Sequence, residues 1–276
     1  MKTVMMADPV RYPRMTTEEI RDTFLLTGLY EPGKINLNYV DLDRAVVGLA
    51  APLEPALELT SYPELRAGYF TERRELGILN IGGAGSVRVN GESYELGNLD
   101  VLYVGKGNEE VVFESRDKAT PAVYYILSYP AHAVWPTTLV KKEEASPMEL
   151  GSLETCNKRT ICKYIHLQGA RSCQLVMGVT HLAAGSNWNT MPPHVHMRRS
   201  EIYMYFNVAE DARVVHLMGP PAETRHILMA DKDIAVSPGW SIHAGVGTRA
   251  YSFCWGMGGE NQDYADMDPA PVASLR

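Results

Sequence analysis

The sequence has few of the features that would place a chain outside the cell or in a membrane. Only four cysteines occur among 276 residues, and they form no C-x-x-C pair: Cys156, Cys162, Cys173 and Cys254. Free thiols are therefore expected, with one buried disulfide as the alternative. No apolar run reaches the length of a membrane span. The first 15 residues lack a continuous apolar segment and do not predict a signal peptide. We expect a soluble, cytoplasmic protein.

Positive charge is also scarce. The chain has 26 lysines and arginines against 33 aspartates and glutamates, which gives a formal net charge of −7 at pH 7. This balance disfavours nucleic acids and anionic membranes as partners. It would also repel an acidic small molecule at long range, so an anionic substrate would need arginines close to its binding site.

The pattern of polar and apolar residues predicts one helix followed by many strands. Thr16 and Glu19 have the spacing of a capping box, and the helix that they begin is expected to end near Gly28. Beyond Asn36, short apolar or alternating runs are separated by turn residues. They predict strands at 44–49, 77–81, 86–89, 101–104, 111–114, 173–180, 201–206, 212–217, 225–229, 234–236 and 251–257.

Turn signals between these runs favour a sandwich or a barrel. Asn90-Gly91 predicts a type I′ hairpin. The two halves also share short motifs: residues 73–75 and 198–201 each precede a strand, and residues 101–105 parallel residues 234–238. A duplicated β-barrel accounts for this likeness, and chance similarity is the alternative.

Four residues of the second half could hold a metal ion. His194 and His196 are separated by one residue, so both imidazoles point to the same face of a β-strand. Glu201 follows His196 by an odd number of residues, so on the same strand its side chain would point to the opposite face. Residues 197–200 are therefore predicted to turn the chain onto a neighbouring antiparallel strand. His243 follows a Ser-Pro-Gly turn. Three imidazoles and one carboxylate suit a divalent transition metal, whereas scattered surface or core histidines are the alternative.

This pattern resembles the cupin signature. The predicted fold class is therefore mainly β, with two cupin-like β-barrels and a short N-terminal helix. Residues 1–135 would form a barrel without metal, because no spaced histidine pair precedes Arg73. Residues 136–155 are polar, lack strand alternation and would form a linker. Residues 156–276 would form the metal-binding barrel. Four protein ligands resemble iron, manganese or nickel sites more than catalytic zinc, and do not by themselves choose the metal.

Other polar residues near the four are candidates for chemistry. Tyr203 shares a strand face with Glu201, and simple packing is the alternative for this tyrosine. Arg199 follows the histidine pair and could bind a carboxylate through two hydrogen bonds, unless it is a solvated surface residue. Arg225 and His226 begin a strand, so one of them must point inward.

Longer stretches carry a more specific resemblance. Over most of its length the chain resembles the 5-keto-4-deoxyuronate isomerase family, the 4-deoxy-L-threo-5-hexosulose-uronate ketol-isomerases of bacterial pectin breakdown. The stretches are 72–85, 102–107, 189–199, 223–226, 237–248, 255–262 and 266–268. The chain departs from the family at Pro193, Met197 and Ser200. These departures bear on the details of the substrate more than on the presence of a metal.

The resemblance implies a hexamer of two-barrel cupin chains with one zinc ion per chain, held by His194, His196, Glu201 and His243. It implies the isomerisation of 5-dehydro-4-deoxy-D-glucuronate to 3-deoxy-D-glycero-2,5-hexodiulosonate. We expect metal-assisted proton transfer through an enediolate.

The reaction needs a base, which the sequence does not identify. The candidates are Tyr203, His226 and Glu260. The substrate carboxylate would need an arginine, and Arg199 and Arg225 are the first choices.

Two other functions remain open at this point. The same four ligands could hold Fe(II) in a cupin dioxygenase. A sugar-binding regulatory cupin without turnover is a third possibility, but no helix-turn-helix or basic patch supports it. The expected partner is a small keto-deoxyuronate, together with other copies of the chain.

Overall fold

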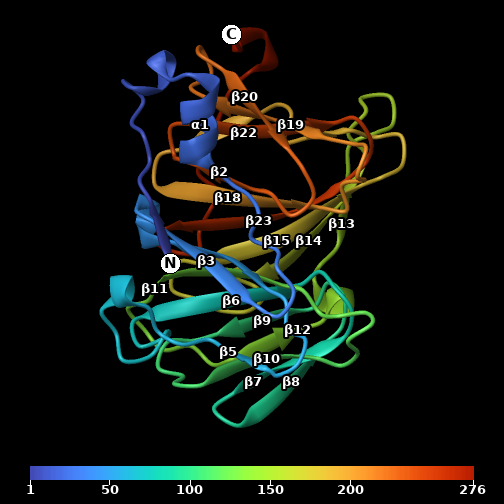
Figure 1. The fold of residues 1–276 in the computed structure, drawn as a ribbon. Coiled ribbons are helices and arrows are strands. Elements are labelled where there is room, and N and C mark those ends of the chain that lie inside the picture. The colour runs from blue at the N-terminus through green and yellow to red at the C-terminus, as the bar shows by residue number, and fades with distance from the viewer. The chain divides into compact units, whose positions relative to one another are not determined.

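The computed structural model describes all residues 1–276 and is mainly β, with one α-helix (Figure 1). The chain forms two compact units. Unit 1 comprises Met1–Val4, Leu29–Ser146 and Lys163–Met177, and unit 2 comprises Met5–Gly28, Pro147–Cys162 and Gly178–Arg276. No helix is both long enough and apolar enough to cross a membrane. All four cysteines are free.

Unit 1 contains a seven-stranded and a four-stranded sheet. Every pair of neighbouring strands is antiparallel except β1 and β3. The larger sheet has the order β1 (Lys2–Val4), β3 (Ile35–Val40), β4 (Val46–Ala50), β11 (Tyr124–Pro130), β6 (Arg74–Asn80), β9 (Val101–Val104) and β12 (Thr138–Val140). The smaller sheet has the order β5 (Leu57–Glu58), β10 (Val111–Ser115), β7 (Gly85–Val89) and β8 (Glu92–Leu96).

The core of unit 1 forms from alternating side chains of both sheets. On β7, Val87 and Val89 are buried whereas Ser86 and Arg88 are half-buried, as expected for a strand with one face on the core. Apolar residues from β6, β9, β10 and β11 complete the same cluster. Burial of this apolar surface is the main stabilising contribution to such a unit.

The remaining two large sheets lie mainly in unit 2 and repeat the strand order of unit 1 in the smaller sheet and in the five central strands of the larger one, whereas the edge strands differ. The larger sheet of unit 2 is β13 (Met148–Leu150), β14 (Arg159–Ile165), β15 (Val176–Leu182), β23 (Ser252–Gly259), β18 (Arg199–Phe206), β21 (Ile234–Ser237) and β2 (Leu25–Leu26). Its smaller sheet is β16 (Trp188–Asn189), β22 (Ile242–Gly247), β19 (Val214–Gly219) and β20 (Arg225–Met229). β17 (His194–His196) pairs with β24 (Met267–Pro269) in a separate ribbon.

The strand registers show which positions of the two units correspond. Leu76 pairs with the last residue of β9 in unit 1, and Glu201 pairs with the last residue of β21 in unit 2. An apolar leucine therefore stands in unit 1 where unit 2 has a carboxylate. That unit 1 binds no metal stays a prediction, as do the domain boundaries at residues 135 and 155.

The helix begins as predicted but ends early. Helix α1 (Thr17–Phe24) has a capping box in which the Thr16 hydroxyl accepts from the Glu19 backbone N–H and the Glu19 carboxylate accepts from the Thr16 backbone N–H. Leu25 is extended, and Leu25–Leu26 pair with β21 instead of continuing the helix toward Gly28. Both leucines are buried there, so strand pairing replaces the last expected turn of helix.

Two short strands lie within residues 136–155, the stretch predicted as a linker. They are β12 and β13, edge strands of the two larger sheets. The 3-10 helix Lys142–Glu144 lies between them. The other 3-10 helices are Tyr12–Arg14, Leu42–Arg44, Pro63–Leu65 and Val272–Ser274. Both β12 and β13 have only three residues and none of them is fully buried, so they show no apolar alternation that a search could find.

Candidate metal centre

Three strands of unit 2 bring the four predicted ligands together. β17 carries both His194 and His196, β18 carries Glu201 and β22 carries His243. Their ligand atoms all lie within 4.8 Å of one another. The Glu201 Oε2 atom lies 3.1 Å from His196 Nε2 and 2.7 Å from His243 Nε2. The Nε2 atoms of His194 and His243 are 3.0 Å apart.

The path of the chain between these ligands differs from the prediction. β17 does not turn onto β18 as an antiparallel neighbour, and this expectation was wrong. β18 pairs with β21 and β23, whereas β17 pairs with β24 near the C-terminus. Both edges of β18 are therefore occupied, so the histidine strand reaches Glu201 through its side chains rather than through backbone pairing.

The cluster is buried and its protonation states suit metal binding. His196, Glu201 and His243 are buried, and His194 is half-buried. Burial, with His243 close by, lowers the pKa of the His194 imidazole to about 4. Burial by itself would raise the pKa of the Glu201 carboxyl, but the charges and hydrogen bonds of His243 and His196 outweigh it and hold that pKa far below its usual range. A neutral His194 imidazole and an ionised Glu201 carboxylate are the forms that ligate metals.

The donor set fits a divalent cation. A buried carboxylate facing three imidazole nitrogens needs a compensating positive charge, which one bound cation would supply. The His243 Nδ1 atom lies 3.4 Å from the Ser241 carbonyl oxygen. A proton on that nitrogen would leave the Nε2 lone pair directed at the other ligands. The four residues could therefore hold one metal ion.

Tyr203 lies beside the cluster. Its ring centroid is 5.4 Å from that of His243, and its hydroxyl is 3.1 Å from Thr190 Oγ1. Burial, reinforced by the Glu201 charge, raises the pKa of Tyr203 well above its usual value. The phenol therefore keeps its proton and can donate a hydrogen bond, which argues against a phenolate base.

A second polar group next to Tyr203 escaped the sequence reasoning. His216 on β19 is fully buried, and its Nδ1 atom lies 2.8 Å from the Tyr205 hydroxyl. Burial lowers the pKa of His216 to about 3, so the imidazole is neutral. The sequence could have predicted its burial, because His216 lies between Val214 and Met218, two apolar residues that share its strand face.

The two candidate arginines differ in their surroundings. Arg199 is buried, and its Nε and Nη2 atoms have no hydrogen-bond partner. Its Nη2 atom lies 3.5 Å from Asp266 Oδ1, and burial lowers the pKa of its guanidinium. Arg225 is half-buried and donates from Nη1 to the Met15 carbonyl oxygen at 3.0 Å. Arg199 therefore has two N–H groups without a hydrogen-bond acceptor, one of them in an ion pair with Asp266, whereas Arg225 holds the N-terminal segment.

The other two candidate bases lie outside the buried cluster. His226 on β20 is exposed, and its neighbour Ile227 is the buried one. Glu260 is exposed and forms an ion pair with Arg198 Nη1 at 3.0 Å. Strand alternation alone could not show which of Arg225 and His226 faces solvent.

Comparisons with known proteins identify the family of this chain. The model of the KduI/IolB family matches residues 40–271. The chain is 49% identical over 270 residues to the 4-deoxy-L-threo-5-hexosulose-uronate ketol-isomerase of Lachnoclostridium phytofermentans, covering 98% of each. It is 50% identical to the enzyme of that name from Formosa agariphila, covering 98% of this chain and 96% of the relative.

Solved structures support the fold alone. An IolB-like protein from Salmonella typhimurium LT2 matches with a TM-score of 0.70 at 14% identity, covering 87% of this chain and 94% of the other. The Lactobacillus farciminis oxalate decarboxylase–formate complex matches with a TM-score of 0.57 at 11% identity, covering 80% and 78%. The chain is thus a mainly β protein with cupin-like structural neighbours.

Proposed function

Because the chain belongs to the KduI/IolB family, we propose that it is a ketol-isomerase acting on a deoxyuronate. It converts 5-dehydro-4-deoxy-D-glucuronate to 3-deoxy-D-glycero-2,5-hexodiulosonate. The observation that carries this proposal is the match over 98% of the chain to curated ketol-isomerases. The buried cluster of three histidines and one glutamate supports it with a site of suitable chemistry. The same relatives disfavour the dioxygenase alternative.

The reaction exchanges a carbonyl and a hydroxyl group between adjacent carbons. A proton leaves the hydroxyl-bearing carbon, an enediolate forms, and a proton returns to the neighbouring carbon. When bound by His194, His196, Glu201 and His243, a divalent cation would polarise the carbonyl and stabilise negative charge on oxygen. Zinc, one ion per chain, is the proposed metal on the strength of the family resemblance.

Of the three candidate residues, Tyr203 has the geometry best suited to donate a proton or a hydrogen bond in the reaction. It is buried beside His243, and its hydroxyl keeps its proton at neutral pH. It can therefore donate a hydrogen bond to an oxygen that becomes negatively charged during the reaction. His226 and Glu260 are exposed and are less suited to this role.

Arg199 is the proposed anchor of the substrate carboxylate. It lies on the same strand as Glu201 and Tyr203, and strand alternation places the three side chains on one face. Its Nε group has no hydrogen-bond partner and its Nη2 group has only the ion pair with Asp266, so these two groups could donate two parallel hydrogen bonds to a carboxylate. Binding the substrate at this end would fix the reacting carbons relative to the metal ligands.

The remaining predictions from the sequence and from the resemblance are also proposed. The two predicted domains would each be a cupin barrel, with residues 1–135 free of metal and residues 156–276 holding it. The repeated strand order of the two units supports this proposal. The chain would act in the cytoplasm as a hexamer.

Removal and return of the metal tests the proposed function. We expect protein stripped by a chelator to lose isomerisation of the ketouronate, followed by NMR, and zinc to restore it. His194→Ala should lose both metal and activity, and Tyr203→Phe should lose activity with metal still bound. His226→Ala, at an exposed position, is the control and should behave like the unaltered protein. Full activity in metal-free protein would contradict the proposal.

A further inference from the structure

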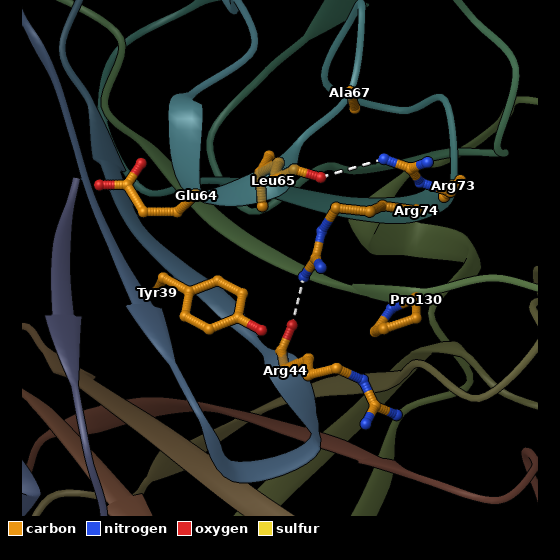
Figure 2. A pocket seen from close by; sticks show the side chains of 8 residues that line it. All are labelled: Tyr39, Arg44, Glu64, Leu65, Ala67, Arg73, Arg74 and Pro130. Atoms are coloured by element: carbon orange, nitrogen blue, oxygen red, sulfur yellow. Dashed lines mark hydrogen bonds between the residues drawn. The ribbon is translucent and has the colours of Figure 1, made fainter.

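Unit 1 has a pocket of about 230 Å³ that the proposed isomerase reaction does not use (Figure 2). Arg44, Arg73 and Arg74 contribute to its lining, together with Tyr39. The pocket has a single acidic residue, Glu64, which lies 3.3 Å from the Met1 amino nitrogen. Three arginines therefore line the pocket together with one carboxylate that already has a cationic neighbour.

The buried member of this set, Arg74, has no charged partner. Only 6% of Arg74 is exposed. Its Nε atom donates to Ser128 Oγ at 3.1 Å, and its Nη2 atom donates to the carbonyl oxygens of Ser128 at 2.9 Å and Arg44 at 2.6 Å. All these acceptors are neutral, and Arg74 forms no ion pair. Burial, with Arg44 nearby, lowers the pKa of Arg74 to about 10. A buried charge without a counter-ion is costly, so an anion here would be stabilising.

Two exposed arginines complete the positive pocket. Figure 2 shows the Arg74 guanidinium beside the Tyr39 hydroxyl, with Arg73 on another side of the pocket. Arg73 donates from Nη2 to the Leu65 carbonyl oxygen at 3.1 Å, and its Nη1 atom lies 3.5 Å from Glu72 Oε1. Arg44 forms no ion pair, and its backbone has a φ of 53°. A non-glycine residue with this φ is uncommon, and the surrounding structure must hold it in place.

We propose that this pocket binds a small oxyanion, the carboxylate or phosphate group of a molecule no larger than a sugar acid. Guanidinium groups bind both carboxylate and phosphate through paired hydrogen bonds. The volume is below the roughly 300–1,000 Å³ of pockets for drug-sized ligands, which limits the occupant to a small molecule. The chain is negatively charged overall, so local arginines rather than long-range attraction would recognise this ligand.

Calorimetric titration of the full-length, metal-loaded protein tests this proposal. The probes are glucuronate, inorganic phosphate and neutral glucose, at fixed ionic strength. At least one anion should bind, and glucose should not. Arg44→Gln should weaken that binding about tenfold, as expected when one charge-assisted interaction is lost. Arg116→Gln, an exposed arginine of unit 1 outside the pocket, is the charge-matched control and should bind like the unaltered protein. Binding of phosphate alone or glucuronate alone identifies the source of the oxyanion.

His194→Ala separates this pocket from the metal centre. Binding that persists in His194→Ala and weakens in Arg44→Gln supports the arginine pocket, whether or not the chain is an isomerase. Binding that is lost in His194→Ala but kept in Arg44→Gln places the anion at the metal centre and overturns the proposal. The absence of binding by both anions, or equal weakening by Arg116→Gln, also overturns it. Arg73→Gln provides a second pocket variant if Arg44→Gln does not fold.

Discussion

At the residue scale, the central claim concerns four side chains. Three histidines and Glu201 converge although they lie on three separate strands. Elemental analysis of the unaltered protein should find one divalent ion per chain. Changing both His194 and His196 to alanine removes two of the four ligands and should leave less than about a tenth of that occupancy, since each ligand contributes strongly to metal affinity. Two ions per chain would mean that unit 1 also binds metal.

His216 predicts a pH dependence of stability. Its pKa is lowered to about 3 in the folded protein, below the ordinary histidine value of about 6.5. Protons therefore bind the unfolded chain preferentially between these two values. The contribution of the neutral imidazole to stability is fully present above pH 6.5 and is lost as the pH falls toward 3.

The comparison of the unaltered protein with His216→Gln measures this contribution. Between pH 7 and 5, the free energy of unfolding of metal-free protein should fall more steeply in the unaltered chain. The pH slope of the unfolding free energy of the unaltered chain should exceed that of His216→Gln by at most about 1.4 kcal/mol per pH unit. Urea unfolding followed by circular dichroism provides the measurement. Parallel pH profiles for the two proteins would show that His216 is not held neutral by the fold.

At the element scale, the hairpin between β7 and β8 gives a clean test of backbone conformation. Asn90 and Gly91 have φ values of 48° and 84°, the positive pair of a type I′ turn. A Cβ atom on Gly91 would contact nothing within 4 Å. Gly91→Ala should therefore lose about 1 kcal/mol of unfolding free energy through backbone strain alone. Gly68→Ala, without a positive φ, is the control and should cost less; equal costs would contradict this explanation.

Local signals in the sequence predicted much of the element structure. The capping box at Thr16 predicted the start of α1, and Asn90-Gly91 predicted the hairpin, because both signals depend on residues close in sequence. The four metal candidates were found because the spaced histidines share one strand face and occur beside turns. The strand at 225–229 was predicted with its observed bounds.

Contacts between distant segments could not be predicted in the same way. β17 pairs with β24 about seventy residues later, and both strands have three residues, too few to show a periodic pattern. The burial of Arg199 depends on the segment around Asp266, which reaches it from near the C-terminus. The exposure of His226 depends on the face of β20 that meets the core.

At the scale of the whole molecule, the repeated strand order serves two purposes. The start of β18 in unit 2 carries the candidate metal ligand Glu201, whereas the start of β6 in unit 1 carries a carboxylate with a structural role. Glu75 is fully buried and accepts hydrogen bonds from the backbone N–H groups of Cys173, Gln174 and Leu175 at 2.6, 2.9 and 2.8 Å. The Tyr103 hydroxyl donates to it at 2.9 Å. One carboxylate thus holds a segment that lies far away in the chain.

Glu75→Gln should destabilise the protein without removing the metal. The amide cannot accept all of these hydrogen bonds, and its own N–H groups would face other donors. We expect a loss of about 3 kcal/mol or more in unfolding free energy, measured by urea unfolding. Glu109→Gln changes an exposed carboxylate of unit 1 and should change stability by less than about 0.5 kcal/mol. Similar losses in the two variants would contradict the role assigned to Glu75.

The most direct test of the proposed isomerase is the reaction of the metal-loaded protein with its ketouronate in deuterated water, followed by NMR. Proton transfer by a side chain allows exchange with solvent before the proton returns. The account predicts conversion to the diulosonate with deuterium on the carbon that receives the proton, and no conversion by the His194→Ala, His196→Ala double variant. Failure of the metal-loaded protein to convert the substrate, or conversion with complete transfer of substrate protium between the two carbons, would contradict it.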